Sequence, residues 1–114
     1  MKKVTTVIRR SPFNSSVTSE ALRMSLGLTL TDNEVTVVFA EDGVYLLSAP
    51  AAEAIGYPDI KRHMETLKEM GCELIAEKES LKKRGLLDRS VEANIRSRRE
   101  IDQIIEQSDR VIGF

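Results

Sequence analysis

Short β-branched runs alternate along this chain with longer stretches in which apolar residues recur every three to four positions. The first pattern is typical of buried strands and the second of amphipathic helices. The strand pattern covers residues 4–8, 34–40, 72–76 and 110–114. Helical segments are predicted to begin at Ser15 or Ser16, to run from Pro58 to Gly71, to form a turn from Ser80 to Arg84, and to carry Ile101, Ile104 and Ile105. This alternation predicts an α/β domain, a three-layer Rossmann-like or flavodoxin-like fold with a mainly parallel sheet of four to five strands.

Length and composition indicate one domain, covering residues 1–114, with a single modest core. The formal net charge is −1, aromatic residues make up 4% of the chain and tryptophan is absent, so nothing favours direct binding to nucleic acid. No segment approaches the roughly 20 apolar residues that span a bilayer, and no membrane partner is expected. The single cysteine, Cys72, excludes an intramolecular disulfide and fits a reducing cytosol, which predicts a cytoplasmic protein.

Two of the predicted strands end abruptly in charged residues. One runs into Asp42 and Gly43, and the other runs into Glu77, which is followed by Ser80 and Arg84. In open α/β sheets, ligands bind at the carboxyl ends of the strands. These five residues are therefore the candidate pocket residues.

Four of the five also have a purely structural interpretation. Asp42 would cap a short helix over residues 45–47, and Ser80 would be the N-cap of the turn that follows it. Glu77 and Arg84 would form a surface ion pair of little energetic weight. The sequence leaves both interpretations open.

Other side chains that could carry chemistry have simpler explanations. The turn after the first strand, residues 9–15, contains no glycine, which argues against a nucleotide-binding loop. Arg9 and Arg10 are better explained as solvated residues than as an anion site. His63, the only histidine, falls on the apolar stripe of its helix, where a packed or interface residue is favoured over a metal ligand. We therefore predict no metal site, no cofactor and no Ser-His-Asp arrangement.

The order of these motifs resembles the DsrE/DsrF/DsrH family, which includes the TusB, TusC and TusD subunits of the bacterial sulfur relay. Residues 40–44 are similar to the family's strand followed by Asp-Gly-Val, and residues 80–86 to its short helix ending in Arg-Gly. Residues 108–114 are similar to its final helix-to-strand ending. The resemblance covers nearly the whole chain. It implies a compact α/β fold and assembly into homo- or hetero-oligomers (dimers, trimers or hexamers) with family members.

The resemblance also implies where sulfur would be carried. Family members with a catalytic cysteine accept sulfur as a persulfide and pass it on, in tRNA thiolation or in sulfur oxidation. Aligned on Arg84-Gly85, that cysteine would fall seven residues before the arginine, where this chain has Glu77. A carboxylate cannot carry a persulfide. Cys72 lies five residues earlier, on the order of 16 Å along the strand, and is better explained as a small buried hydrophobe.

An apolar segment over residues 43–47 and 49–52 bears on assembly. If it is exposed, it marks an oligomer interface. If it packs inward, it is part of the core. The sequence favours neither.

Three functional interpretations follow. The favoured one is a non-catalytic partner or scaffolding subunit of a sulfur-relay assembly, which would not be an enzyme. The second is a sulfur carrier or sulfurtransferase acting through Cys72, the one catalytic candidate. The third is a homo-oligomeric small-ligand-binding protein that uses the pocket around Asp42, Glu77, Ser80 and Arg84.

Overall fold

The computed structural model describes residues 2–10, 17–47, 58–87 and 93–114. Within these ranges five strands form one parallel sheet in the order β4-β3-β2-β1-β5. The strands are β1 (Lys2–Ile8), β2 (Asn33–Phe39), β3 (Glu73–Glu77), β4 (Asn94–Arg96) and β5 (Arg110–Gly113). The helices are α1 (Val17–Thr29), the 3-10 helix η1 (Glu41–Leu47), α3 (Pro58–Glu69), α4 (Lys78–Lys83) and α5 (Arg98–Glu106). The predicted α/β class and parallel sheet are confirmed.

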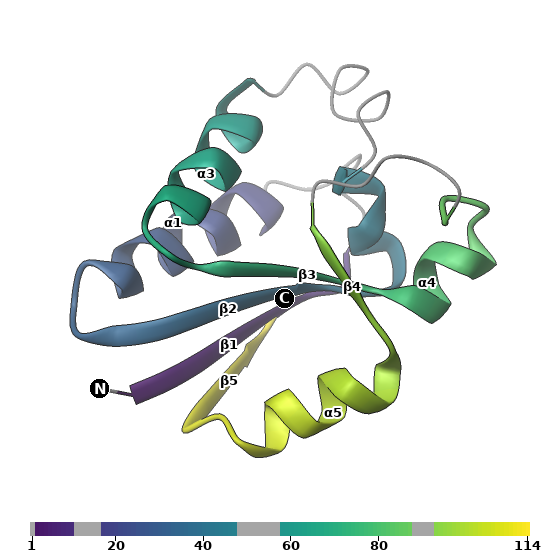
Figure 1. The fold of residues 1–114 in the computed structure, drawn as a ribbon. Helices are drawn as coiled ribbons and strands as arrows, with labels where there is room; N and C mark the ends of the chain where they lie inside the picture. Colours follow the sequence, from purple (N-terminus) through teal and green to yellow (C-terminus); the bar gives the residue numbers. More distant parts are fainter. Residues whose placement is uncertain (1, 11–16, 48–57, 88–92) are drawn as a thin grey trace.

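Helices cover both faces of the sheet. Successive residues of each strand point to opposite sides and so pack against different helices. Val7, Val38 and Ile75 lie side by side across three strands and pack against Ile101 of α5. The neighbouring positions point the other way, into a larger core that Phe39 shares with residues of α1, α3 and η1. Figure 1 shows α1 and α3 on one side of the sheet and α5 on the other. This is the three-layer arrangement that the alternation of elements predicts.

Local signals locate the ends of the long helices. α3 begins at Pro58, as predicted, since proline suits the first turn of a helix. Its predicted stop, Gly71, has φ of 84°, and Gly85 after α4 has φ of 68°. Both values lie in the left-handed region that glycine adopts at little cost. The predicted helix start at Ser15 or Ser16 lies outside the described residues.

The edge strand β4 is the element that the sequence pattern does not locate. All three of its residues are exposed, so it has no apolar alternation. Its pairing with β3 alone defines it. Residues 96–100, which are rich in charge, comprise the end of β4, the N-cap Ser97 and the first turn of α5. None of the helices in the described ranges is long and apolar enough to cross a membrane.

Candidate functional site

The carboxyl ends of β1, β2 and β3 meet at one edge of the sheet, and the chain turns sharply there after β2. Glu41 has φ of 50°, a left-handed value that is uncommon for a residue with a side chain. Gly43 packs against the end of β1, where a Cβ would lie 2.2 Å from the carbonyl oxygen of Ile8. Only glycine fits this position. Gly43 is thus a packing residue that lets η1 lie against the sheet edge.

Glu77, the last residue of β3, has a side chain that is only 8% exposed. Its Oε1 accepts a hydrogen bond from the Ser80 hydroxyl at 2.7 Å and another from Nη2 of Arg98 at 2.9 Å. The Ser80 hydroxyl in turn accepts from the backbone N–H of Glu41 at 2.8 Å. The carboxylate therefore joins the end of β3 to the turn after β2 and to the start of α5.

Opposing effects set the pKa of Glu77. Burial raises the pKa of this carboxyl, because the charged form loses hydration. Hydrogen bonds from Arg98 and Ser80, together with the positive charges of Arg98 and Arg9, outweigh burial and lower the pKa below its ordinary value of 4.5. The hydrogen bond to Glu77 also raises the pKa of the Arg98 guanidinium. Glu77 is therefore an anion at neutral pH.

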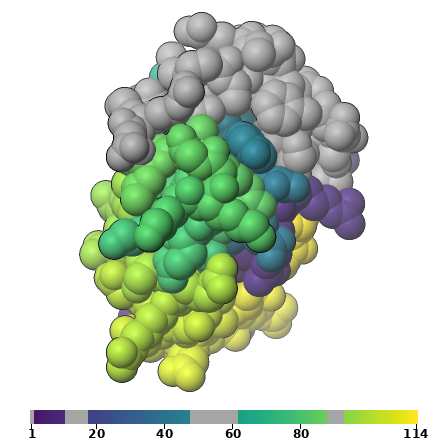
Figure 2. Space-filling model, turned by 90° about the vertical axis from the view of Figure 1, so that its right-hand side faces the viewer, coloured from purple at the N-terminus to yellow at the C-terminus, as the bar shows by residue number. Residues whose placement is uncertain are grey.

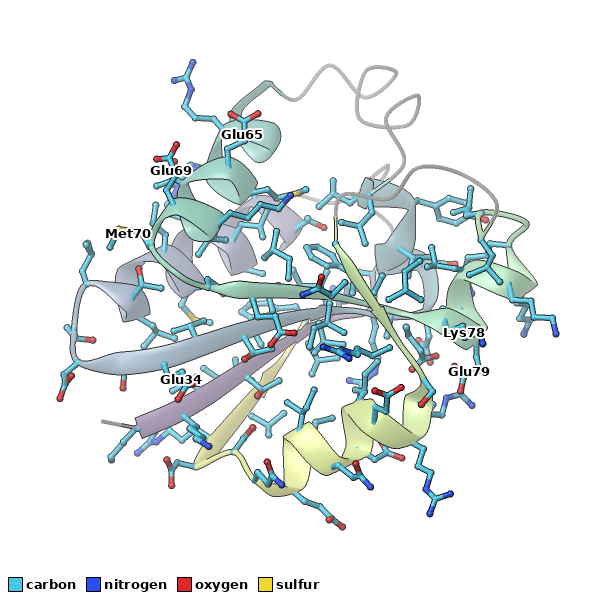
Figure 3. The ribbon with its side chains drawn as sticks, in the orientation of Figure 1. Glu34, Glu65, Glu69, Met70, Lys78 and Glu79 are labelled. Carbon is cyan, nitrogen blue, oxygen red and sulfur yellow. The ribbon has the colours of Figure 1, made fainter. Side chains whose placement is uncertain are left out.

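A second carboxylate, on α4, holds the start of α5. The two carboxylate oxygens of Glu79 lie 2.9 and 3.1 Å from the backbone nitrogen of Arg98, which donates to them. Ser97 and Glu100 close a capping box over the same turn. Figure 3 shows Glu79 at the start of α4, on the side of α5. Glu77 and Glu79 thus bind the side chain and the backbone of Arg98 and fix α4 against α5.

Arg84, which follows α4, forms a separate ion pair. Its Nε and Nη2 donate to Oδ1 of Asp42 at 3.1 and 2.9 Å, and its Nη1 donates to the carbonyl of Ser80 at 3.3 Å. The guanidinium also lies over the ring of Tyr45, 5.9 Å from its centroid. The side chain of Arg84 is 17% exposed and that of Asp42 is 55% exposed. The pair therefore fixes η1 against α4 at the border of the solvent.

Comparisons with known proteins place this architecture. The sequence profile of the DsrE/DsrF-like family matches residues 2–114. The chain belongs to the DsrE/DsrF-like family. No curated protein sequence matches it. The crystal structure of the YchN protein from E. coli superposes with a TM-score of 0.85 over 100% of each chain, at 20% sequence identity, which shows a shared fold.

In this DsrE/DsrF-like chain the candidate pocket residues lie at one sheet edge, although their pairing differs from the prediction. The expected Glu77–Arg84 pair is wrong, because Glu77 binds Arg98 while Arg84 binds Asp42. Ser80 is not an N-cap: it is the third residue of α4, buried, and Glu77 stands at the N-cap position. Asp42 does not cap a helix over residues 45–47 either, since it is the second residue of η1. Ser80 links the two ion pairs through its hydroxyl and its carbonyl.

Cys72 lies at the other end of β3, next to Gly71. It is 7% exposed, and its thiol donates to the carbonyl of Glu73 at 3.7 Å. Burial is the main cause that raises the pKa of this thiol to about 12. A backbone hydrogen bond from Val37 lowers the pKa, and the negative charge of Glu73 raises it further. The thiol of this family member is therefore neutral and enclosed, in agreement with its interpretation as a buried hydrophobe. His63 is half-buried on α3.

The apolar segment after β2 is packed inward over the part that the structure describes. Gly43, Val44, Leu46 and Leu47 are all buried, so residues 43–47 belong to the core and not to an exposed patch. Residues 49–52 lie outside the described residues. Within the described ranges, no group of three His, Cys, Asp or Glu side chains could hold a metal ion.

Sequence reasoning overlooked Arg98 and Glu79 of this DsrE/DsrF-like site, and it interpreted Arg9 as a solvated residue, which the structure does leave exposed. The capping-box signature Ser97-x-x-Glu100 marks the start of α5 and so places Arg98 in its first turn. Because β4 precedes that turn, Arg98 arrives at the same sheet edge as Glu77. Arg9 follows β1, and its charge acts on Glu77. The parallel topology would bring both arginines to this edge once β4 is recognised.

Proposed function

We propose that this protein is a non-catalytic partner or scaffolding subunit of a sulfur-relay-like assembly of DsrE/DsrF-like proteins. The observation that carries the proposal is the bonding of Glu77, at the position where the resemblance implies a persulfide cysteine. A relay residue must form a sulfur–sulfur bond, which a carboxylate cannot do. Glu77 is instead held by Ser80 and Arg98, on two neighbouring helices. Its role is therefore to organise this edge of the subunit.

Cys72 is a poor substitute for the missing cysteine. The attacking species in sulfur transfer is the thiolate, so a relay thiol needs a low pKa and access to its donor. Cys72 is 7% exposed and its pKa is raised to about 12 by burial. A small-ligand site finds less support as well, because Asp42 and Glu77 are each paired with an arginine of the same chain.

Sulfur loading tests the proposal directly. The protein is incubated with a cysteine desulfurase and cysteine, and its intact mass is measured before and after reduction. We expect no added sulfur on the wild-type chain. Sulfur that is added, lost on reduction and absent from a Cys72→Ser variant would overturn the proposal, because Cys72 would then be a relay thiol.

A variant that is designed to accept sulfur provides the matched control for this experiment. In the Cys72→Ser background, Glu77→Cys places a thiol among Arg98, Arg9 and Ser80, whose positive charge and hydrogen bonding lower a thiol pKa. We expect it to accept one sulfur atom from the desulfurase persulfide. Lys82→Cys in the same background puts an exposed thiol on α4 without removing a bond of the site, and it controls for unselective loading. Equal loading of the two variants would remove the argument that position 77 is a relay position.

Assembly is tested by co-expression with a cysteine-bearing homologue. We expect a stable hetero-oligomer, observed by size-exclusion chromatography coupled to light scattering. A chain that remains monomeric with every such homologue of its host would contradict the scaffolding role. Within the apolar segment, Gly43, Val44, Leu46 and Leu47 are buried in the subunit itself.

A further inference from the structure

Among the described residues, cations exceed carboxylates at the carboxyl edge of the sheet. The last residues of β3 and β4, together with the described residues that come after β1 to β4, form the segments 9–10, 41–42, 77–84 and 96–100. Together they hold nine lysine or arginine residues against five aspartate or glutamate residues, in a chain whose net charge is −1. Positive charge is therefore concentrated at one edge of a slightly acidic protein.

Most of these carboxylates are already used inside the subunit. Asp42 neutralises Arg84, and Glu77 neutralises Arg98. Glu79 accepts from a backbone N–H, and Glu100 accepts from Ser97 while also pairing with Arg96 at 3.6 Å. They leave little negative charge for the remaining lysines and arginines of this edge.

Four cations of α4 and α5 stay uncompensated within the described residues, and we call them the basic surface: Lys78, Lys82, Lys83 and Arg99. All four are exposed, and none has a hydrogen-bond or ion-pair acceptor in the described part of the chain. Lys78 and Lys82 are four residues apart on α4, a spacing at which like charges repel. Lys82 and Lys83 lie in the last turn of α4, where positive charge suits the helix dipole, but no carboxylate of the described residues pairs with them.

The basic surface is also held in a fixed shape. Lys78 and Arg99 are the sequence neighbours of Glu79 and Arg98, whose hydrogen bonds fix α4 against α5. Figure 2 looks onto this edge and shows α4, in green, directly next to the start of α5, in yellow-green. The backbone positions of these charges are therefore set before a partner binds, and only the side chains lose freedom on binding.

We propose that the basic surface docks an acidic face of a partner protein. An RNA backbone would be the other polyanion to consider. The chain has only two tyrosines, three phenylalanines and no tryptophan, and Tyr45 already lies beneath Arg84, so stacking platforms for bases are scarce. The chain has a net charge of −1, so its positive charge can attract a partner only locally, at this patch. A folded protein with an acidic face provides such a local match. This docking rests on the proposed scaffolding function, for which it names a contact surface and the charge of the partner.

Charge reversal tests the docking surface. The probe is a fluorescein-labelled oligoglutamate peptide, and binding to the full chain is followed by fluorescence anisotropy at low ionic strength. The Lys78→Glu, Lys82→Glu, Lys83→Glu triple variant is expected to weaken binding by about tenfold or more, since each exposed charge contributes modestly. The matched control reverses three exposed cations that lie outside α4 and α5, Lys2, Arg23 and Lys68, and is expected to change binding less than about twofold.

Each outcome decides the proposal. Loss in the α4 variant alone, with backbone amides of residues 78–83 and 98–99 shifted in NMR spectra by the peptide, supports it. Equal loss in the two triple variants, or no measurable binding to the wild type, overturns it. Tighter binding to an oligouridine RNA than to oligoglutamate overturns the choice of a protein partner. None of these measurements involves Glu77 or sulfur loading, so failure here and failure of the proposed function are separate results.

Discussion

Replacing Glu77 separates the role of its charge from the role of its hydrogen bond. Glu77→Gln keeps the shape of the side chain and an oxygen that can accept from the buried Ser80 hydroxyl, but removes the charge facing Arg98. Glu77→Leu keeps a similar volume and removes the acceptor. Ser80 is only 3% exposed, and its hydroxyl would then lose the acceptor of its hydrogen bond.

The burial of the two partners of Glu77 sets the size of the effect. An unsatisfied buried donor costs about 1–3 kcal/mol, so Glu77→Leu is expected to lower the free energy of unfolding by that amount. Arg98 is 61% exposed, and water can solvate it when the charge is lost, so Glu77→Gln is expected to cost clearly less. Glu73, half-exposed on the same strand and paired with Arg96 at 3.7 Å, offers the control, and Glu73→Leu should cost little.

Urea unfolding followed by circular dichroism measures these differences, and pH supplies an independent check. The pKa of Glu77 is lowered in the folded chain, so its ionised form stabilises the fold above the ordinary value of 4.5. That contribution is lost as pH falls through the lower folded pKa. The difference in the free energy of unfolding between the wild type and Glu77→Gln should therefore be largest at neutral pH and disappear on acidification. A gap independent of pH, or a Gln variant as unstable as the Leu variant, would refute this account of the site.

The remaining predictions concern Gly43 and Cys72. Gly43→Ala is expected to destabilise the fold by about 3 kcal/mol, because its Cβ would meet the Ile8 carbonyl oxygen at 2.2 Å. Gly27→Ala, in α1 with nothing within 4 Å, is the control and should stabilise by about 0.5–1 kcal/mol; urea unfolding of both variants tests the contrast, and similar values would contradict it. Stability should fall as pH rises above 9.0, where the Cys72 thiol ionises only in the unfolded chain, and Cys72→Ala should remove that loss. Iodoacetamide should label native Cys72 far more slowly than the urea-unfolded chain, as read from intact mass, and equal rates would show an accessible thiol.

The fold could be predicted from the sequence wherever the spacing of apolar residues reflects which side chains are buried. β2 and β3 are buried runs between polar ends, and α3 carries a helical stripe with proline at its start, so their types were predictable. β4 was not, because its three exposed residues leave no apolar signal and only pairing with β3 defines it.

The location of the candidate site could be predicted from the sequence, but its ion pairs and hydrogen bonds could not. Parallel strands bring their carboxyl ends to one edge, so Asp42 and Glu77 were expected near one another. Which arginine each binds depends on where β3 ends, and β3 passes into α4 without a loop, at Glu77 to Lys78. That junction puts Ser80 inside the helix instead of at its cap. Arg98 lies 21 residues beyond Glu77 in sequence, a contact that no local pattern reveals.

The surroundings of Glu77 bear on why an anion occupies that position at all. A persulfide or thiolate at the end of β3 would need nearby positive charge and a hydroxyl donor, and Arg98, Arg9 and Ser80 supply these to the carboxylate. Leucine or alanine at this position would leave the positive charge of Arg98 uncompensated, whereas the Glu77 carboxylate pairs with it. This electrostatic setting supports the proposal that Glu77 stands where a relay protein would carry a thiolate. We therefore expect Glu77→Cys to destabilise the fold less than Glu77→Ala or Glu77→Leu at neutral pH, because an ionised thiol restores a negative charge facing Arg98.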